Sequence, residues 1–331
     1  MIWLQFVAIA LVIVVAGARL ARYGDVLGEK IGLGRTWIGV ALLAATTSLP
    51  ELFTGFGATA LSHLPDIAVG DVLGSCMFNL LILSMMDVLQ PEPLSTRAHQ
   101  GHALSIGLGL VLVSIAGLGI AGRGHIPVLG WIGSASALLI AGYFVSMRAV
   151  FIDQQHRRAR EVREVAEERR YDAIPLRSAI LHYALAALLV VGAALWLPGL
   201  GADLAQQTGL GETFIGSLFV AITTSLPEVV VSIAAVRIGA IDLGIGNVLG
   251  SNLFNFMILG LDDVWYRPGP LLAAVNPSHI VVVLAVVAMN ALFLVGLTTR
   301  VVTKRFAIAW DTAAMAAVYL AAIALTFVLR A

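Results

Sequence analysis

Two glutamates, Glu51 and Glu228, each end the same six-residue sequence, Thr-Thr-Ser-Leu-Pro-Glu, inside a long apolar segment. A carboxylate in such a segment is costly to bury and is therefore a functional candidate. In each copy, the hydroxyls three and four positions earlier share the helical face of the carboxylate. Hydroxyl and carboxylate oxygens are the ligands that hard cations such as Na⁺ and Ca²⁺ prefer. The two copies therefore predict a cation site with ligands from two distant parts of the chain.

A second polar block follows each glutamate after about twenty residues, at 70–79 and at 246–255. Its polar residues recur every four positions and predict a stripe that faces the carboxylate of the neighbouring helix: Asp71, Ser75 and Asn79, then Asn247, Ser251 and Asn255. The glycines of both blocks form small-xxx-small pairs, which close helix packing explains. Asp71 has no acidic counterpart in the second block. It could be a third acidic ligand, a proton carrier or a charge near the outer face.

Pro50 and Pro227 lie within these apolar segments, directly before the glutamates. A proline inside a helix has no N–H and clashes with the carbonyl four residues earlier. We therefore expect each helix to be broken or kinked, which would free the carbonyls of Thr46 and Thr223. At membrane depth, such backbone survives only where it is buried in protein or lines a wet cavity.

The composition is typical of a polytopic membrane protein, with 59% hydrophobic and 12% charged residues and a mean hydropathy of +0.94. We predict an all-α fold of ten spans, the first retained rather than cleaved, at 2–20, 37–61, 66–88, 101–121, 127–148, 178–198, 213–236, 241–262, 277–298 and 307–328. The net charge of +0 argues against a nucleic-acid partner, and lone Cys76 excludes an internal disulfide. No enzymatic motif is present, so we expect neither an enzyme nor a cofactor.

The chain divides into two halves, 1–148 with a repeat at 38–83 and 178–331 with a repeat at 215–259, joined by the polar segment 149–177. Nine of fourteen positions are identical between 38–51 and 215–228. If the N-terminus is outside, 17 of the 20 Lys and Arg residues lie inside. The positive-inside rule then predicts that both termini are extracytoplasmic and that the linker, a solvated helix or a disordered segment, is cytoplasmic. Because five spans per half is an odd number, the repeats are expected to be inverted, with helices 2 and 7 broken.

At these motifs the chain resembles the cation/calcium exchanger superfamily, which includes sodium/calcium exchangers. The two repeats of that family read Gly-Thr-Ser-x-Pro-Glu and then Gly-Asn-x-x-Gly-Ser-Asn-x-Phe-Asn/Asp. The resemblance implies a prokaryotic inner-membrane antiporter that exchanges Ca²⁺ for Na⁺, with K⁺ or H⁺ in some branches, by alternating access to one site. Its implied partners are small cations and the lipid bilayer, and it leaves the oligomeric state open.

The resemblance also implies a ligand set by position. It comprises side-chain oxygens and two main-chain carbonyls, with Asp71 as an accessory candidate: Ala44, Thr47, Ser48, Glu51, Ser75, Asn79, Ala221, Thr224, Ser225, Glu228, Ser251 and Asn255. Several positions depart from the family pattern: Thr46, Thr223, Gly55, Asp71, Cys76 and Asn255. These departures leave the coupling ion and the stoichiometry open. A proton-coupled exchanger of the same fold is the alternative; a passive cation channel and an intramembrane hydrolase with paired glutamates are more distant ones.

Overall fold

The computed structural model describes residues 2–31, 35–123, 125, 127–161, 171, 173–196, 222, 224–299, 303–304 and 307–329. Within these residues, eight helices are long and apolar enough to cross a membrane: α1 (Ile2–Ile31), α5 (Pro65–Val88), α7 (His102–Ala121), α8 (Ser134–Glu161), α9 (Leu176–Ala194), α13 (Ile241–Trp265), α15 (His279–Thr299) and α16 (Trp310–Leu329). A bent pair, 38–47 and 49–61, makes a ninth if it is counted as one span. The all-helical membrane class is therefore confirmed.

The bent span consists of five short helical pieces: α2 (Arg35–Trp37), η1 (Ile38–Leu43), α3 (Ala44–Thr47), α4 (Leu49–Phe56) and η2 (Gly57–Leu61). The predicted span 213–236 corresponds to α12 (Leu226–Arg237), and most of the preceding residues of that span lie outside the described ranges. The count of ten spans therefore stays a prediction. Two short helices, α6 (Leu94–Arg97) and α14 (Leu271–Ala274), follow the ends of α5 and α13.

The predicted span 127–148 is wrong at both ends. Its start is an antiparallel hairpin of β1 (Val128–Leu129) and β2 (Ile132–Gly133), which turns at Gly130 with φ +71°. Helix α8 then continues to Glu161, well into the segment predicted as a linker. No glycine or proline interrupts residues 149–161, so nothing in the backbone stops the helix there. Residues 162–170 and 172 of the predicted linker lie outside the described part of the chain.

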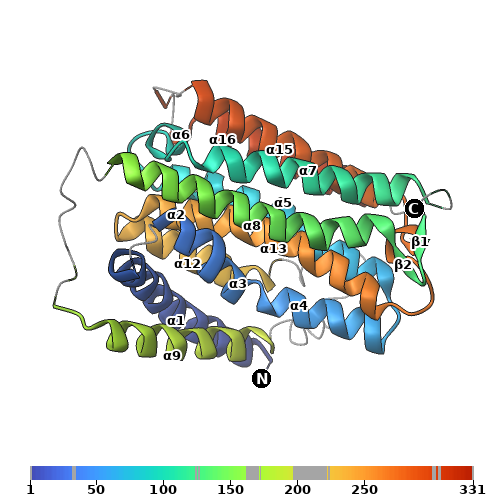
Figure 1. Ribbon diagram of the computed structural model, residues 1–331, viewed down its shortest axis with the longest axis horizontal. Coiled ribbons are helices and arrows are strands. Elements are labelled where there is room, and N and C mark those ends of the chain that lie inside the picture. Colours follow the sequence, from blue (N-terminus) through green and yellow to red (C-terminus); the bar gives the residue numbers. More distant parts are fainter. Residues whose placement is uncertain are drawn as a thin grey trace.

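The long helices run roughly parallel or antiparallel to one another in layers (Figure 1). Helices α5 and α13 lie in the middle and pack against each other, and their inner residues join the main hydrophobic core. At one side of the molecule, α1 packs along α9 over a second, smaller core that α12 also enters. Helices α5 and α13 therefore hold their polar blocks at the most protected place in the bundle.

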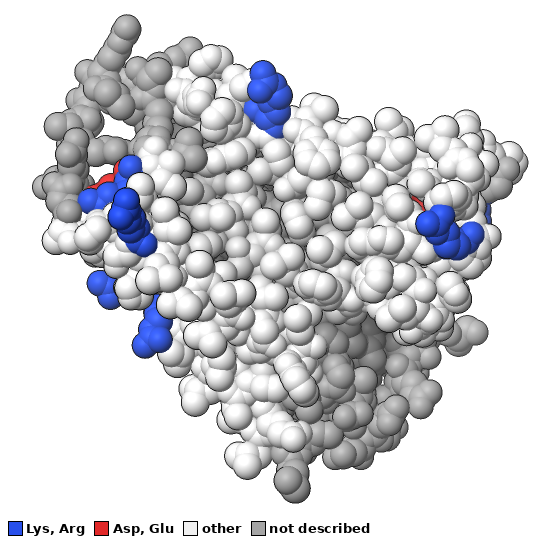
Figure 2. Space-filling view, turned by 60° about the horizontal axis from the view of Figure 1, so that its bottom comes forward, with Lys and Arg blue, Asp and Glu red and all other residues white. Residues whose placement is uncertain are grey.

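The outer surface suits a lipid environment. Large apolar side chains on the outer helices are strongly exposed, among them Leu4 (75%), Leu118 (68%), Leu188 (71%) and Leu320 (67%). Figure 2 shows one face on which the Lys and Arg side chains lie toward the margins, with a wide uncharged area between them. In water, an apolar area of this extent would drive aggregation, whereas a bilayer covers it.

Two buried aspartates fix the loops at the ends of α5 and α13. Asp87 accepts main-chain hydrogen bonds from Leu94 at 2.6 Å and from Ala309 at 2.7 Å. Asp263 makes the matching pair of bonds, with Leu271 at 2.6 Å and Gly133 at 2.8 Å. Each carboxylate satisfies main-chain donors that would otherwise be buried and unpaired. The two ends of the central helix pair are thus built in the same way.

The opposite ends of α5 and α13 are held by a second matched pair of contacts. His279 Nε2 lies 3.0 Å from Asp66 Oδ1, and His102 Nε2 lies 3.0 Å from Asp242 Oδ1. Each aspartate is in the first turn of its helix, and each histidine opens a helix of the other half. The sequence alone does not indicate this pairing, because the paired residues come from distant segments.

Candidate cation site

The predicted break of the first half is present and occurs at a serine, whereas most of the helix before the second predicted break lies outside the described residues. Helix α3 ends before Ser48 (φ −90°, ψ 9°), and α4 continues after a bend of 42°. Ser225 (φ −83°, ψ 5°) stands in the same position before α12. Pro50 and Pro227 each occupy the first turn of the following helix, where a missing N–H costs nothing. The prolines therefore start a helix rather than kink the middle of one.

Each serine at a break donates a hydrogen bond to the glutamate of the other half. Ser48 Oγ lies 3.0 Å from Glu228 Oε1, and Ser225 Oγ lies 3.2 Å from Glu51 Oε1. All four side chains are fully buried. The two copies of the motif therefore meet at one place, with the polar groups of one copy bonded to those of the other.

The polar stripes of α5 and α13 also reach across to the other half. Thr224 Oγ1 donates to Asp71 Oδ1 at 3.2 Å, and Thr47 Oγ1 donates to Asn247 Oδ1 at 3.3 Å. Asp71 is 1% exposed and so belongs to the buried cluster rather than to the outer face. The sequence predicts that each stripe faces the glutamate of its own half, and these hydrogen bonds between the two halves were not predicted.

The remaining residues of the predicted set complete the cluster. Ser75 Oγ accepts from Ser225 at 3.0 Å, while Ser251 Oγ donates to Glu228 Oε1 at 3.3 Å, within its own half as predicted. The carbonyl of Ala44 already accepts hydrogen bonds from Ser48 N at 3.0 Å and Thr47 Oγ1 at 3.4 Å. Ala221 lies outside the described residues.

One functional candidate, Asn252, was missed. Its side chain accepts from Asn79 Nδ2 at 3.1 Å and donates to the carbonyl of Cys76 at 3.1 Å. It therefore ties α13 to α5 at the point where the two helices cross. The signal available in the sequence was its position, since it aligns with Cys76 of the first block.

Several buried polar atoms of the cluster have no hydrogen-bond partner among the described residues: Glu51 Oε2, Glu228 Oε2, Asp71 Oδ2, Asn79 Oδ1, Asn255 Oδ1 and Asn255 Nδ2. Buried polar atoms are normally paired, so this concentration indicates a place made for a ligand. Five of the six atoms are oxygens, which suits a hard cation. Across the described ranges, no three His, Cys, Asp or Glu side chains are arranged to hold a metal ion. The carboxylates would therefore act together with hydroxyl and amide oxygens.

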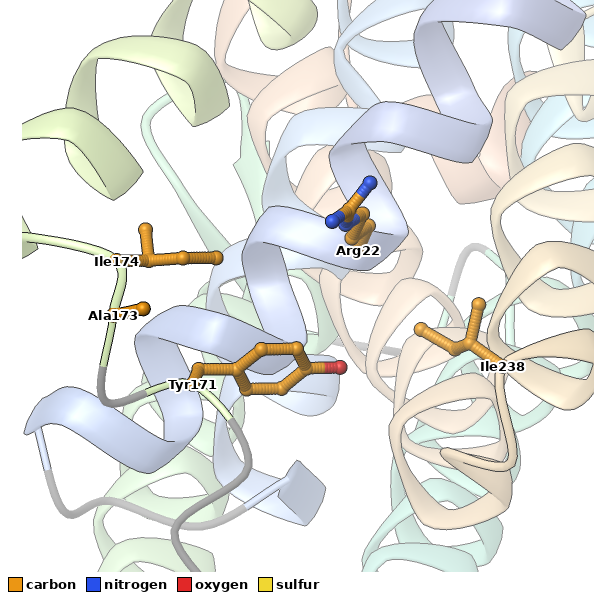
Figure 3. Close-up of a pocket in the computed structure, with 5 residues that line it drawn as sticks. All are labelled: Arg22, Tyr171, Ala173, Ile174 and Ile238. Carbon is orange, nitrogen blue, oxygen red and sulfur yellow. The ribbon is translucent and has the colours of Figure 1, made fainter.

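A separate cavity of about 460 Å³ lies away from this cluster (Figure 3). It is bordered by α1, by residues 171 and 173–174 and by the end of α12, and its lining residues are Arg22, Tyr171, Ala173, Ile174 and Ile238. Arg22 is its one charged lining residue, and that positive charge would repel a cation. The cavity is therefore unsuited to the chemistry that the buried cluster supports.

Comparisons with known proteins identify the family and the fold of the chain. The family model described as "Sodium/calcium exchanger protein" matches residues 1–151 and 178–329. "Inner membrane protein YrbG" of Escherichia coli is 28% identical over 253 residues, 76% of each chain. "Sodium/calcium exchanger MaX1" of Methanosarcina acetivorans is 33% identical over 124 residues, 37% of this chain and 33% of that protein. The solved structure of the sodium-calcium exchanger NCX_Mj with Na⁺ and Sr²⁺ has the same fold, with a TM-score of 0.74 and 21% identity over 98% of this chain and 99% of that one.

Proposed function

We propose that this chain, which belongs to the sodium/calcium exchanger protein family, is a secondary active antiporter that exchanges Ca²⁺ for Na⁺ at the buried cluster. One observation carries the proposal. Glu51 and Glu228 are fully buried, each takes one hydrogen bond from a serine of the other half, and each keeps one oxygen without a partner. Two carboxylates balance one Ca²⁺ or two Na⁺, so the ions compete for the same oxygens and exchange becomes obligatory.

The proposed ligands are the residues predicted from the family pattern, now with their contacts known. We propose side-chain ligation by Thr47, Ser48, Glu51, Ser75, Asn79, Thr224, Ser225, Glu228, Ser251 and Asn255, with main-chain carbonyls of Ala44 and Ala221 and with Asp71 as an accessory group. The matched bonds between the halves support this set. The ions are transported substrates, and the chain needs no resident cofactor for this role.

The proposed architecture is ten spans in two inverted halves, 1–148 and 178–331, that alternate access to one site. The reciprocal contacts support it, since each cross-half bond described for the glutamates, the helix ends and the loops has a counterpart at the matching positions. We place the protein in the inner membrane, with both termini extracytoplasmic and the 149–177 linker in the cytoplasm.

Uptake of radioactive Ca²⁺ into proteoliposomes tests the proposed function. Vesicles loaded with Na⁺ are compared with vesicles loaded with K⁺ and with acid-loaded vesicles. We expect uptake only from the Na⁺-loaded vesicles, because Na⁺ must leave the shared oxygens as Ca²⁺ enters. Uptake that follows the proton gradient alone would favour the proton-coupled alternative, for which Asp71 supplies a third carboxylate in the cluster. Ca²⁺ entry without any countertransport would indicate a channel.

The two serine–glutamate bonds predict equal effects from Ser48→Ala and Ser225→Ala. Each change removes one hydrogen bond to a buried carboxylate, worth about 1.5–3 kcal/mol, so the half-saturating Ca²⁺ concentration should rise roughly tenfold or more. Concentration-dependent uptake by each variant measures this. Ser114→Ala is the matched control, because Ser114 Oγ is exposed and bonds only to the carbonyl of Leu110 in its own helix. An effect in one serine variant alone would contradict a shared site.

A further inference from the structure

A further buried carboxylate, Asp262, lies outside the cluster described so far. It is on α13 with no exposed surface, and neither of its oxygens has a hydrogen-bond partner among the described residues. Its neighbour Asp263 performs the structural task of binding the loop donors. Among the described residues, no hydrogen bond to Asp262 offsets the free-energy cost of burying it, and an unpaired buried carboxylate is costly.

Gly55 makes room for this carboxylate beside the glutamate helix. A Cβ atom at Gly55 would lie 2.7 Å from Asp262 Oδ2 and 2.8 Å from its Cγ, so a larger residue would displace Asp262. Gly55 is four residues after Glu51 on α4 and shares its helical face. The carboxylate of Asp262 therefore lies against the turn of α4 that follows Glu51.

Asp71 is on α5, which packs against both α4 and α13. One oxygen of Asp71 accepts from Thr224, and the other has no partner among the described residues. Glu51, Asp71 and Asp262 thus form a series of buried acidic groups with free oxygens on three helices that pack together.

This acidic series leads to one end of the bundle only. The end of α13 lies beside the start of α5, as shown by the ring contacts of Trp265 with Phe56 at 5.1 Å and of Tyr266 with His63 at 6.4 Å. Asp263 corresponds to Asp87, so the counterpart of Asp262 in the first half is Met86.

Two neighbouring positions also differ between the repeats. The equivalent of Asp71 in the second repeat is Asn247, and the equivalent of Gly55 is Ser232. The fold therefore tolerates an apolar or neutral residue at these positions, and the acidic groups need a different explanation.

We propose that Asp71 and Asp262 form a subsite for a small inorganic cation, on a path between the buried cluster and the membrane face that carries the end of α13. This subsite rests on the proposed cation exchange, and it adds a difference between the two membrane faces. Buried carboxylates with free oxygens attract a cation, and among the described residues no group of three His, Cys, Asp or Glu side chains encloses them, which suits brief occupation during entry. Cations arriving from this face would meet Asp262 before the central site.

Kinetics at the two faces test the subsite. We compare wild type with Asp262→Asn and with Asp262→Met, which copies the residue of the other half, in right-side-out and inside-out membrane vesicles. The half-saturating concentrations of Ca²⁺ and Na⁺ should rise about tenfold at the face of Tyr266 and stay unchanged at the other. Gly55→Ala should act in the same direction, because it displaces Asp262 without removing its charge. Unchanged values at both faces, or equal changes at both, would overturn the subsite while leaving cation exchange intact.

A binding measurement that needs no transport provides an independent test. Tb³⁺ stands in for Ca²⁺, and its luminescence is sensitised by nearby tryptophans. Trp265 is three residues from Asp262 on the same helix, and Trp131 Nε1 donates to the carbonyl of Val264 at 3.1 Å. Purified wild type should give a tryptophan-sensitised Tb³⁺ signal that Asp262→Asn loses and Glu228→Gln keeps. A signal that survives Asp262→Asn would overturn the subsite, even if the wild type exchanged no cation.

Discussion

Replacing either Glu51 or Glu228 by glutamine is expected to abolish cation exchange and to leave folded protein. Glutamine keeps the size of the side chain and can still accept the serine hydrogen bond, at 3.2 Å for Glu51 and 3.0 Å for Glu228. It removes the negative charge, which in a buried site is worth about 3–5 kcal/mol, or at least about a hundredfold in affinity. Gradient-driven Ca²⁺ uptake by each variant, beside size-exclusion profiles, measures both outcomes.

The two glutamate variants should fail to the same extent, because the carboxylates have matching partners in the two halves. Glu92→Gln is the control, since Glu92 is exposed and loses the same charge outside the cluster. Full exchange activity in either Glu51→Gln or Glu228→Gln would exclude a shared site. A variant that does not fold would be replaced by the aspartate substitution, which keeps the charge and shortens the side chain.

The change Gly250→Ala is expected to destabilise the whole protein strongly. A Cβ atom at Gly250 would lie 2.5 Å from the Cα and 2.7 Å from the carbonyl carbon of Val40, which are main-chain atoms of η1. The bent span would have to move away from α13, and its residues Thr47, Ser48 and Glu51 would move with it. Overpacking of this kind costs about 3 kcal/mol at the upper end of its usual range. Thermal unfolding in detergent, followed by light scattering, measures the loss.

Gly107→Ala on α7 is the matched control for Gly250→Ala. No described atom lies within 4 Å of its Cβ position, so an alanine there should leave the unfolding temperature unchanged or raise it slightly. Equal unfolding temperatures for wild type and Gly250→Ala would show that η1 can separate from α13 at little cost in free energy. The close packing of η1 against α13 would then not be what positions Glu51.

The sequence alone predicts the parts of this protein that depend on local chemistry. The duplicated motif, the break beside Pro50 and the class of fold follow from composition, spacing and the geometry of proline. The hairpin at 128–133 was not foreseen, because its apolar residues resemble the start of a span. The sequence left open whether the charged segment after residue 148 is a helix or disordered, and its first part, to Glu161, is a helix.

The parts that escaped prediction depend on contacts between distant segments. Asp87 and Ala309 are 222 residues apart in the chain, and no local pattern connects them. In the same way, the bond from Thr224 to Asp71 requires the segment before α12 to lie against α5. Asp262 gave no signal because its block continues past the repeated motif, where the halves diverge. Its unpaired burial is visible only in three dimensions.

The reciprocal serine–glutamate bonds have a consequence for the thermodynamic balance of the exchange cycle. Opening the site toward either face would strain bonds of the same kind, one from Ser48 and one from Ser225, at nearly equal length. The two open states would then start with similar free energies, and the ion gradients would decide the direction of net flux. The carboxylates that break the symmetry, Asp71 and Asp262, would change the apparent affinity at one face, while the gradients would still set the direction of net flux.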